Sequence, residues 1–338
     1  MITISLCMIV KNEENLLKRC LDSIHDLMDE IIIVDTGSTD RTKEIAGQYT
    51  DKIYDFTWVY DFSAARNFSF SKATMEYIYV ADADEVLDEE NRKKFRQLKE
   101  AMLPEIELVQ MLYCNQLQYN TTYNYDEEYR PKLYKRLREF VWEEPVHESV
   151  RRTPVIYDSD IRILHMPENN HAGRDFDTFL RMWSRGQRMS KKLHNMYARE
   201  LFIAGENEDF LAAEPVFLET LKASDRGLSE VKEAACVVAR AARLRGDIAE
   251  FFKNALKDTA SEGCAEICCE LGQFYYDRKE YQEALIWYYN AAFETKSILN
   301  IHSSGDLPLK RLEELSTLLG QTEDAKHYHE LCEAWEAE

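Results

Sequence analysis

Two continuous apolar runs near the start of the chain constrain its fold class. They are Ile4 to Val10 and Ile31 to Val34, and each is what a strand buried on both faces requires. Between them, apolar residues recur at three- and four-residue intervals from Leu16 to Ile24, which predicts a helix. A strand, a helix and a second strand in this order predict a parallel sheet, because parallel neighbours need such a crossover.

The second predicted strand runs directly into the segment Asp35 to Asp40, whose letters are DTGSTD. Its Ser, its Thr and its last Asp can cap a helix that begins near Arg41, so capping alone explains Asp40. Asp35 stands instead at the carboxyl end of a parallel strand, where open α/β sheets place their ligand crevice. We therefore expect Asp35 to contact a nucleotide.

A third apolar stretch, Met75 to Val80, ends in Asp82, Ala83 and Asp84. The two carboxylates are one residue apart, and carboxylate oxygens are hard donors that favour Mg²⁺ or Mn²⁺. This D-x-D placement suits a divalent cation beside a diphosphate. The alternative for an isolated D-x-D is a solvated acidic turn.

These motifs lie in four sequence blocks that follow one another in order. The blocks are Leu6 to Glu14, Val34 to Thr42, Ala64 to Asn67, and Val80 to Glu85. With them the chain resembles the family 2 glycosyltransferases of GT-A fold, and within these the bacterial branch that opens with LCMIVKNEE and continues with VDTGSTD and DAD. The resemblance extends more loosely to Val146 to Glu148 and to Ile163 to His165. It covers the first half of the chain.

The resemblance implies a donor site and a metal site. In this family the residue matching Asp35 contacts the nucleotide base or ribose, and the residue matching Arg66 approaches the base or diphosphate, which suits a planar guanidinium. A surface salt bridge is the alternative for Arg66. Asp84 resembles the main ligand of Mn²⁺ or Mg²⁺, and Asp82 touches the ribose or the metal. The donor-binding residues implied are Val10, Asn12, Glu13, Asp35, Arg66, Asn67, Asp82 and Ala83.

Enzymes of this fold also add a late histidine to the metal and a carboxylate base. His165 fits the histidine because it ends the apolar stretch that begins at Ile161, and His147 is the alternative ligand. Glu148 stands where the family places the base that takes the acceptor's proton during inverting transfer. The sequence departs from the family here, because Glu144 and Pro145 replace a usual Gly, so details on the acceptor side are in doubt.

The composition excludes several other classes of protein. A net charge of −20 argues against nucleic-acid binding, which needs clustered Lys and Arg. No apolar stretch of membrane-spanning length and no signal peptide is found, so we expect a cytoplasmic protein without a transmembrane segment. The eight cysteines lie mostly in apolar periodic segments, as reduced core residues do, and the group around Cys264 and Cys268 lacks the second ligand pair of a zinc site.

Helical patterns replace strand patterns from Asp175 onward, which predicts a GT-A domain at 1–174 with a Rossmann-like mixed sheet, followed by an all-α domain at 175–338. The segment from Cys269 to Ala292 matches the tetratricopeptide pattern L-G-x₂-Y with later small Ala positions, and weaker copies surround it. We expect three to four degenerate repeats, whose surface holds a peptide or a second protomer as a homodimer. The Tyr- and Asn-rich stretch Tyr113 to Tyr134 is either an acceptor-facing element or an ordinary half-exposed strand.

The resulting hypothesis is that the protein is an inverting, metal-dependent hexosyltransferase that moves a sugar from a nucleotide-sugar donor to a peptide or protein. The expected donor is a UDP-sugar. A cell-surface glycan or lipid is the alternative acceptor. A hypothesis of another class is a non-catalytic repeat scaffold with a vestigial nucleotide-sugar domain, against which the intact D-x-D, Asp35, Arg66 and Glu148 argue. A nucleotidyltransferase would share the sheet and metal but lacks the late VHE and His pattern.

Overall fold

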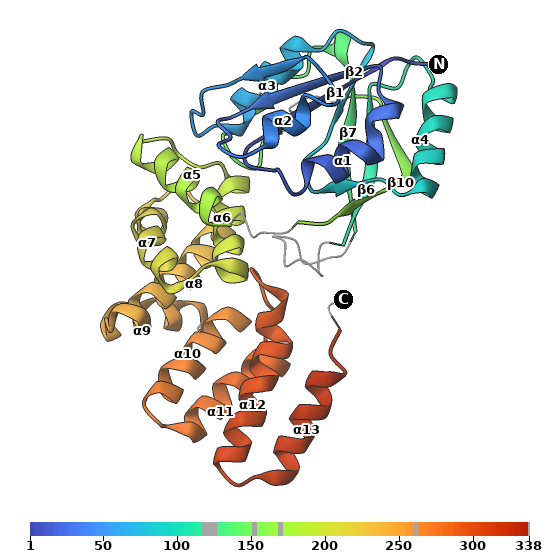
Figure 1. Ribbon diagram of the computed structural model, residues 1–338. Helices are drawn as coiled ribbons and strands as arrows, with labels where there is room; N and C mark the ends of the chain where they lie inside the picture. The colour runs from blue at the N-terminus through green and yellow to red at the C-terminus, as the bar shows by residue number, and fades with distance from the viewer. Residues whose placement is uncertain (116–126, 151–153, 168–171, 260–262, 337–338) are drawn as a thin grey trace. The chain divides into compact units, whose positions relative to one another are not determined.

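The computed structural model describes residues 1–115, 127–150, 154–167, 172–259 and 263–336. Two compact units make up the chain, Met1–His171 and Ala172–Glu338 (Figure 1). The sequence places the boundary after residue 174. The Asn, Thr and Tyr residues at 120–125, part of the stretch considered for acceptor binding, lie outside the described residues.

A mixed eight-stranded sheet organises the first unit, in the order β3-β2-β1-β4-β7-β6-β10-β5. The strands are β1 (Ile4–Val10), β2 (Glu30–Asp35), β3 (Ile53–Asp55), β4 (Tyr77–Val80), β5 (Glu85–Val86), β6 (Leu108–Cys114), β7 (Glu128–Lys135) and β10 (Ile156–His165). β1 pairs in parallel with β2 and β4, which confirms the parallel pairing predicted from the apolar runs. A second sheet contains β8 (Trp142–Glu143) and β9 (Ser149–Val150).

Helices cover both faces of the large sheet. The alternate residues of β1, Ile4, Leu6 and Met8, share a core with α1 (Leu17–Ile24), α2 (Thr42–Ala46) and α4 (Glu89–Ala101). Cys7, which points to the opposite face, shares a second core with aromatic residues of α3 (Phe62–Lys72). Because β1 is buried on both faces, its sequence is apolar throughout rather than alternating. Single turns of 3₁₀ helix lie at His25–Leu27 and Arg136–Arg138.

The strand directions bring the sequence motifs to one edge. β7 is antiparallel to both β4 and β6, and β6 is parallel to β10. The carboxyl ends of β1, β2, β4 and β10 therefore all lie at the same edge of the sheet. The segments after Val10, Asp35 and Val80 meet His165 there.

The second unit is helical throughout its described residues, and its helices are arranged as successive antiparallel pairs (Figure 1). They are α5 (Ala172–Ser184), α6 (Lys191–Ala204), α7 (Asn207–Lys222), α8 (Leu228–Arg245), α9 (Ile248–Thr259), α10 (Ala265–Asp277), α11 (Tyr281–Tyr289), a π-helical turn (Asn290–Glu294), a 3₁₀ turn (Ile301–Ser304), α12 (Asp306–Leu318) and α13 (Thr322–Glu333). The predicted fold class is confirmed in its layout, because an α/β domain with a mixed sheet precedes a helical domain.

The tetratricopeptide signature has a direct packing reason at Gly272. A Cβ atom at this position would lie 2.8 Å from the ring of Tyr288, which is itself buried on α11. Glycine therefore lets α10 and α11 approach closely. Phe274 and Tyr288 are core residues, whereas Tyr289 is 41% exposed and packs against Phe293 with the ring planes inclined by 43°.

Within the described residues, no helix is both long enough and apolar enough to cross a membrane.

Candidate active site

The turn after β2 is built from hydrogen bonds among the predicted donor-binding residues themselves. The Asp35 carboxylate accepts from the backbone N–H groups of Gly37, at 3.1 Å, and Ser38, at 3.0 Å, and its side chain is 1% exposed. Asn12, with a left-handed φ of 55°, donates its N–H to Ser38 Oγ at 2.9 Å. Its side-chain oxygen accepts from Thr39 N at 2.8 Å. The two predicted blocks therefore form one rigid loop pair.

Two further predicted donor-site residues belong to the same loop pair. The Val10 carbonyl accepts from the Thr36 N–H at 2.9 Å, and the Glu13 N–H donates to Thr42 Oγ1 at 2.7 Å. Asp40 accepts from Thr42 N at 3.0 Å and from Glu14 N at 3.1 Å, so it caps the short helix α2 and also holds the loop after β1. The local polar groups thus fix the backbone on which a donor would rest.

Asp84 and His165 come together at the end of β4 and the end of β10. His165 Nε2 lies 3.2 Å from Asp84 Oδ2, and both side chains are about nine-tenths buried. Asp84 Oδ1 is buried and has no hydrogen-bond partner among the described residues. A buried carboxylate oxygen in this state is costly unless a cation or donor completes it. A carboxylate oxygen beside an imidazole nitrogen fits Mn²⁺ or Mg²⁺ as a ligand pair.

Arg66 joins the D-x-D turn to the predicted base. It lies on α3, donates from Nη2 to Asp82 at 3.1 Å, and binds Glu148 through Nε. Its guanidinium also stacks 5.1 Å from the Trp142 ring. Burial alone would raise the pKa of Asp82, but Arg66 and the more distant Lys132 together hold it well below its usual range. The arrangement keeps Asp82 ionised and holds Glu148 beside it.

The structure gives Asn67 and Ala83 roles within the protein. The Asn67 side chain accepts from Trp142 N at 2.8 Å and donates to Trp142 O at 2.9 Å, so it fastens α3 to β8. Ala83 is buried between the two aspartates of the turn. Both residues position Arg66 or Asp84, and a direct donor contact for either stays a prediction.

Sequence reasoning did not identify a buried ion pair beside the D-x-D. Lys132 of β7 lies 2.7 Å from Glu85, and both side chains are at most 5% exposed. Burial raises the pKa of Glu85 to about 7, although Lys132 acts in the opposite direction. Glu85 ends the block Val80 to Glu85, but Lys132 stands in no motif, and β7 reaches β4 only through sheet pairing.

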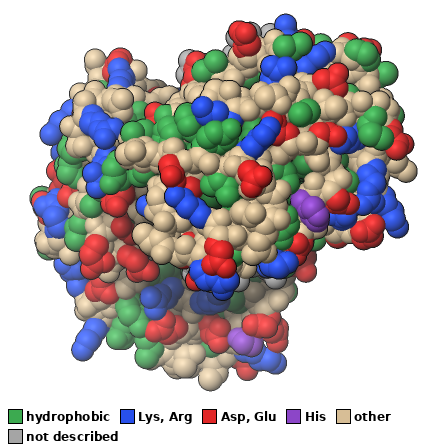
Figure 2. All heavy atoms as spheres, turned by 45° about the horizontal axis from the view of Figure 1, so that its top comes forward, with side chains coloured by type: hydrophobic (Ala, Val, Ile, Leu, Met, Phe, Trp, Pro, Cys, Tyr) green, Lys and Arg blue, Asp and Glu red, His purple; other side chains and the backbone are tan. Residues whose placement is uncertain are grey.

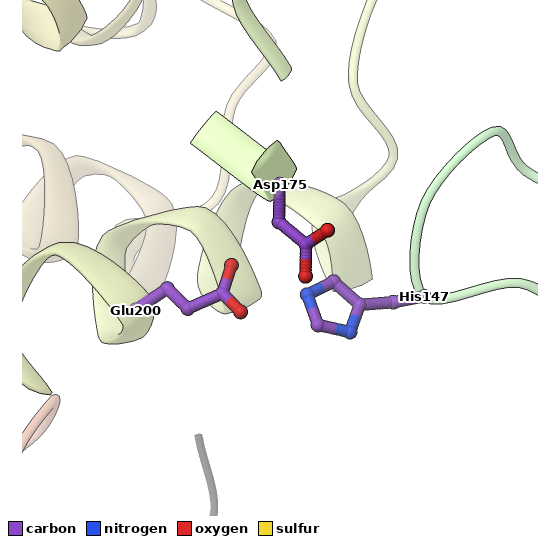
Figure 3. Close-up of side chains that lie close together, drawn as sticks. All are labelled: His147, Asp175 and Glu200. Atoms are coloured by element: carbon purple, nitrogen blue, oxygen red, sulfur yellow. The ribbon is translucent and has the colours of Figure 1, made fainter. Parts of the chain in front are cut away.

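A metal-binding role for His147, the alternative ligand, stays a prediction. It belongs to the segment between β8 and β9 and has a left-handed φ of 47°. Figure 3 draws it with Asp175 of α5 and Glu200 of α6, two residues that belong to the second unit. Within the first unit, His165 is the histidine that contacts an aspartate of the D-x-D.

The surface shows no extended basic area on the face drawn in Figure 2. Acidic and basic side chains are interspersed there with apolar ones. This distribution agrees with the acidic net charge of −20, and the face lacks the clustered cations that nucleic-acid binding needs.

Comparisons with known proteins relate to the same part of the chain. Residues 5–156 match the family model of Glycosyl transferase family 2. A TPR repeat-containing protein of Synechococcus elongatus is 52% identical over 87 residues, which are 26% of this chain and 22% of that protein. The SPbeta prophage-derived glycosyltransferase SunS of Bacillus subtilis is 41% identical over 98 residues, 28% of this chain and 23% of SunS. The chain thus spans less than a quarter of the length of these relatives.

A solved structure is also similar in part. Glucosyl-3-phosphoglycerate synthase from Mycobacterium tuberculosis, in complex with Mn²⁺ and UDP-glucose, aligns with 56% of this chain and 81% of its own. The TM-score is 0.41 and the sequence identity is 15%. The match over residues 5–156 falls on the unit that holds the mixed sheet and the motifs described above, and this part of the chain is similar to the glycosyl transferases of family 2.

Proposed function

We propose that the protein is an inverting, metal-dependent glycosyltransferase that uses a nucleotide-sugar donor, with UDP-sugars as the first candidates and a peptide or protein as the acceptor. The observation that carries the proposal is the meeting of Asp84 and His165, with one Asp84 oxygen unsatisfied, next to the Arg66 contacts. Inverting transfer needs two side chains that bind the metal, a cation beside the diphosphate and a carboxylate base.

In this proposal Asp84 and His165 would hold Mn²⁺ or Mg²⁺, which would neutralise charge on the leaving diphosphate. Glu148 takes the proton from the acceptor's nucleophilic atom while that atom attacks the anomeric carbon from the face opposite the leaving group. Arg66 holds Glu148 and Asp82 in fixed positions through its two ion pairs. The loop pair of Asn12 and Asp35 supports the nucleoside.

The second unit provides the basis for choosing a peptide or protein acceptor. Stacked helix pairs form extended surfaces that commonly bind peptides. Glycan and lipid acceptors are the alternatives, and parallel assays with a peptide library, a glycan and a lipid-linked sugar would distinguish them. A homodimer through the helical unit and a cytoplasmic location also remain predictions, tested by light scattering and by cell fractionation.

Donor hydrolysis tests the central claim. Purified protein is incubated with UDP-glucose, UDP-N-acetylglucosamine and UDP-galactose, with Mn²⁺ or with EDTA, and release of UDP is measured. The Asp84→Asn variant is the matched control, because it removes one ligand charge and leaves the rest of the site. Release that depends on both Mn²⁺ and Asp84 supports the proposal.

Thermal shift with the same nucleotides separates an enzyme from a scaffold. Ligand binding raises the unfolding temperature in proportion to occupancy, whether or not turnover follows. A donor-induced shift without any turnover, across donors and acceptors, would favour the scaffold with a vestigial nucleotide-sugar domain. Neither a shift nor turnover with any nucleotide sugar would contradict both hypotheses.

A further inference from the structure

Three side chains form a stacked column that ends at the proposed metal ligand. The guanidinium of Arg130 lies 3.8 Å from the centre of the Tyr113 ring. The Tyr113 ring also packs against His165, with ring centres 5.0 Å apart and planes inclined by 35°. His165 in turn contacts Asp84. The column therefore links a cation on β7 to the end of β10.

The column lies at the edge of the sheet where the site residues gather. Arg130 pairs with Met111 in the antiparallel register of β7 and β6, and Tyr113 is next to the last residue of β6. Because β6 runs in the same direction as β4 and β10, the carboxyl half of β6 and the amino half of β7 share the edge of Asp84 and His165. Arg130 therefore stands on the donor side of the sheet.

Neighbouring side chains hold the Arg130 side chain in place. Glu128, on the same strand, accepts from Arg130 Nε at 2.5 Å, and 28% of the Arg130 side chain is exposed. Tyr113 is almost fully buried, so the surrounding core holds its ring in place. β7 pairs with β4, the strand that leads into the D-x-D, and this pairing brings Arg130 toward the same edge of the sheet.

We propose that Arg130 is a diphosphate-binding residue of the donor site, held by Glu128 and by stacking on Tyr113. This inference rests on the proposed function. A guanidinium presents a planar fork of N–H donors that matches phosphate oxygens, and the phosphate chain of a nucleotide bound to the metal would lie beside the column. Tyr113 is a positioning residue, because it fixes both the Arg130 fork and the His165 ring.

A second cationic side chain would help to neutralise the charge of the diphosphate. A nucleoside diphosphate carries more negative charge than one divalent ion neutralises, and Arg66 is already engaged by Glu148 and Asp82. Arg130 forms an ion pair with Glu128 at the edge of the site. A contact to the phosphates by Arg130 would supply the remaining neutralisation without moving the Arg66 network.

The test compares a nucleoside diphosphate with its monophosphate. Affinities for UDP and UMP in the presence of Mn²⁺ are measured by calorimetry for the wild type, Arg130→Gln, Arg130→Lys and the control Arg138→Gln. Arg138 is a suitable control because it is exposed and ion-paired with Glu107. Loss of a charge-assisted hydrogen bond predicts UDP binding about 10-fold to 100-fold weaker in Arg130→Gln. UMP binding should change much less, and Arg130→Lys should recover part of the UDP affinity.

Several results would overturn the inference. Wild-type affinity of Arg130→Gln for UDP would do so, and so would an equal loss for UMP and UDP, which would indicate a general structural effect. If the wild type binds UDP, these outcomes leave the proposed function in place. If the wild type binds none of UDP, GDP and ADP in the presence of Mn²⁺, the proposed function itself fails. Far-UV circular dichroism of each variant verifies that it is folded.

Tyr113 offers an independent check. Tyr113→Phe keeps the ring that stacks on Arg130 and His165, so its UDP affinity should stay within about threefold of wild type. Tyr113→Leu removes the ring and should weaken UDP binding about as much as Arg130→Gln, because the fork is no longer fixed. Equal UDP affinity in the Leu and Phe variants would contradict the role of the column.

Discussion

Two turns of the first unit each contain an aspartate at the end of a strand, but the two carboxylates differ in their hydrogen bonds. Asp35 and Asp84 each follow a parallel strand of the same sheet, β2 and β4, and each carboxylate is largely buried. Asp35 accepts hydrogen bonds from the backbone of its own turn, at Gly37 and Ser38. Asp84 contacts His165 through one oxygen, while the other oxygen has no hydrogen-bond partner among the described residues. One carboxylate is satisfied by the fold, and the other is not.

The comparison teaches that position at a strand end does not by itself identify a ligand. The same positional rule selects both aspartates in the sequence. Hydrogen bonding separates them, since a fold rarely leaves a buried carboxylate oxygen unsatisfied without a functional reason. We therefore expect substitutions at Asp84 to affect metal-dependent chemistry and substitutions at Asp35 to affect stability as well as binding.

The largest effect is expected from Asp84→Asn. Removing one charged ligand weakens the cation that stabilises the leaving diphosphate, and the loss of several kcal/mol corresponds to a rate about 10³-fold lower. Because Asp84 Oδ1 makes no bond within the described protein, the unfolding temperature should change little. Turnover is measured across Mn²⁺ concentrations, with thermal unfolding in parallel. Near-normal turnover at limiting Mn²⁺ would rule out the assignment.

Glu148→Gln should slow transfer by about 10²-fold to 10⁴-fold, as loss of a general base does. Donor affinity should be spared, because Arg66 keeps its contact with Asp82 when its contact with Glu148 is weakened. If the acceptor is a cysteine thiol the loss should be smaller, since a thiol ionises with little help. Single-turnover rates and donor titrations are the measurements.

The same experiment can reassign Glu148. A variant that loses donor affinity but keeps its transfer rate would make Glu148 a donor-site residue whose task is to hold Arg66. Glu143→Gln is the matched control, because Glu143 is an exposed glutamate on β8, five residues before Glu148 in the sequence. Its rate should equal that of the wild type.

Much of the fold could be predicted because its signals are local. The apolar run of β1 and the helical spacing before β2 determine those elements within a few residues of chain. The family resemblance pointed to His165 and Asp84 as metal ligands, and the two side chains are in contact, while their binding of a metal stays a prediction. Short-range periodicity and strand direction are properties that a single sequence carries.

The remaining parts of the site depend on pairing between distant strands. Lys132 and Arg130 reach the D-x-D only because β7 inserts antiparallel between β4 and β6. No spacing in the sequence specifies that insertion, and neither residue stands in a motif. Asn67 is a second example: its block resembles the family, and its amide holds Trp142, while a donor contact stays a prediction. A motif match locates a residue but does not say which group it binds.

A carboxylate at the opposite end of β2 gives a purely structural reference. Glu30 accepts from Thr74 N at 2.8 Å and lies 2.5 Å from Lys52. Burial opposes ionisation, but these contacts, Lys52 first, lower the pKa of Glu30 from 4.5 to about 2. The stability that Glu30 contributes is therefore fully present above about pH 4.5 and is lost as the pH falls through about 2.

Glu30→Gln should accordingly lower the free energy of unfolding by about 2–3 kcal/mol at pH 7, because hydrogen bonds to a charged group are lost. The difference between variant and wild type should shrink as the pH is lowered from 4.5 toward 2. Urea titrations at several pH values measure it, and donor affinity at pH 7 should be unchanged. A difference that stays constant with pH would mean that the Glu30 charge is not the cause.

The smallest effect is expected from Asp35→Asn, and it tests the comparison most directly. The amide keeps one oxygen for the N–H groups of Gly37 and Ser38 but loses the charge that strengthens both bonds and attracts Lys43, 3.6 Å away. We expect a loss of about 1–2 kcal/mol in unfolding free energy, measured by urea titration. Donor affinity should fall as well, because the loop pair with Asn12 loosens. Asp84→Asn should show the opposite pattern, with stability kept and turnover lost. Equal stability losses in the two variants would show that the unsatisfied oxygen of Asp84 does not distinguish a ligand from a turn residue.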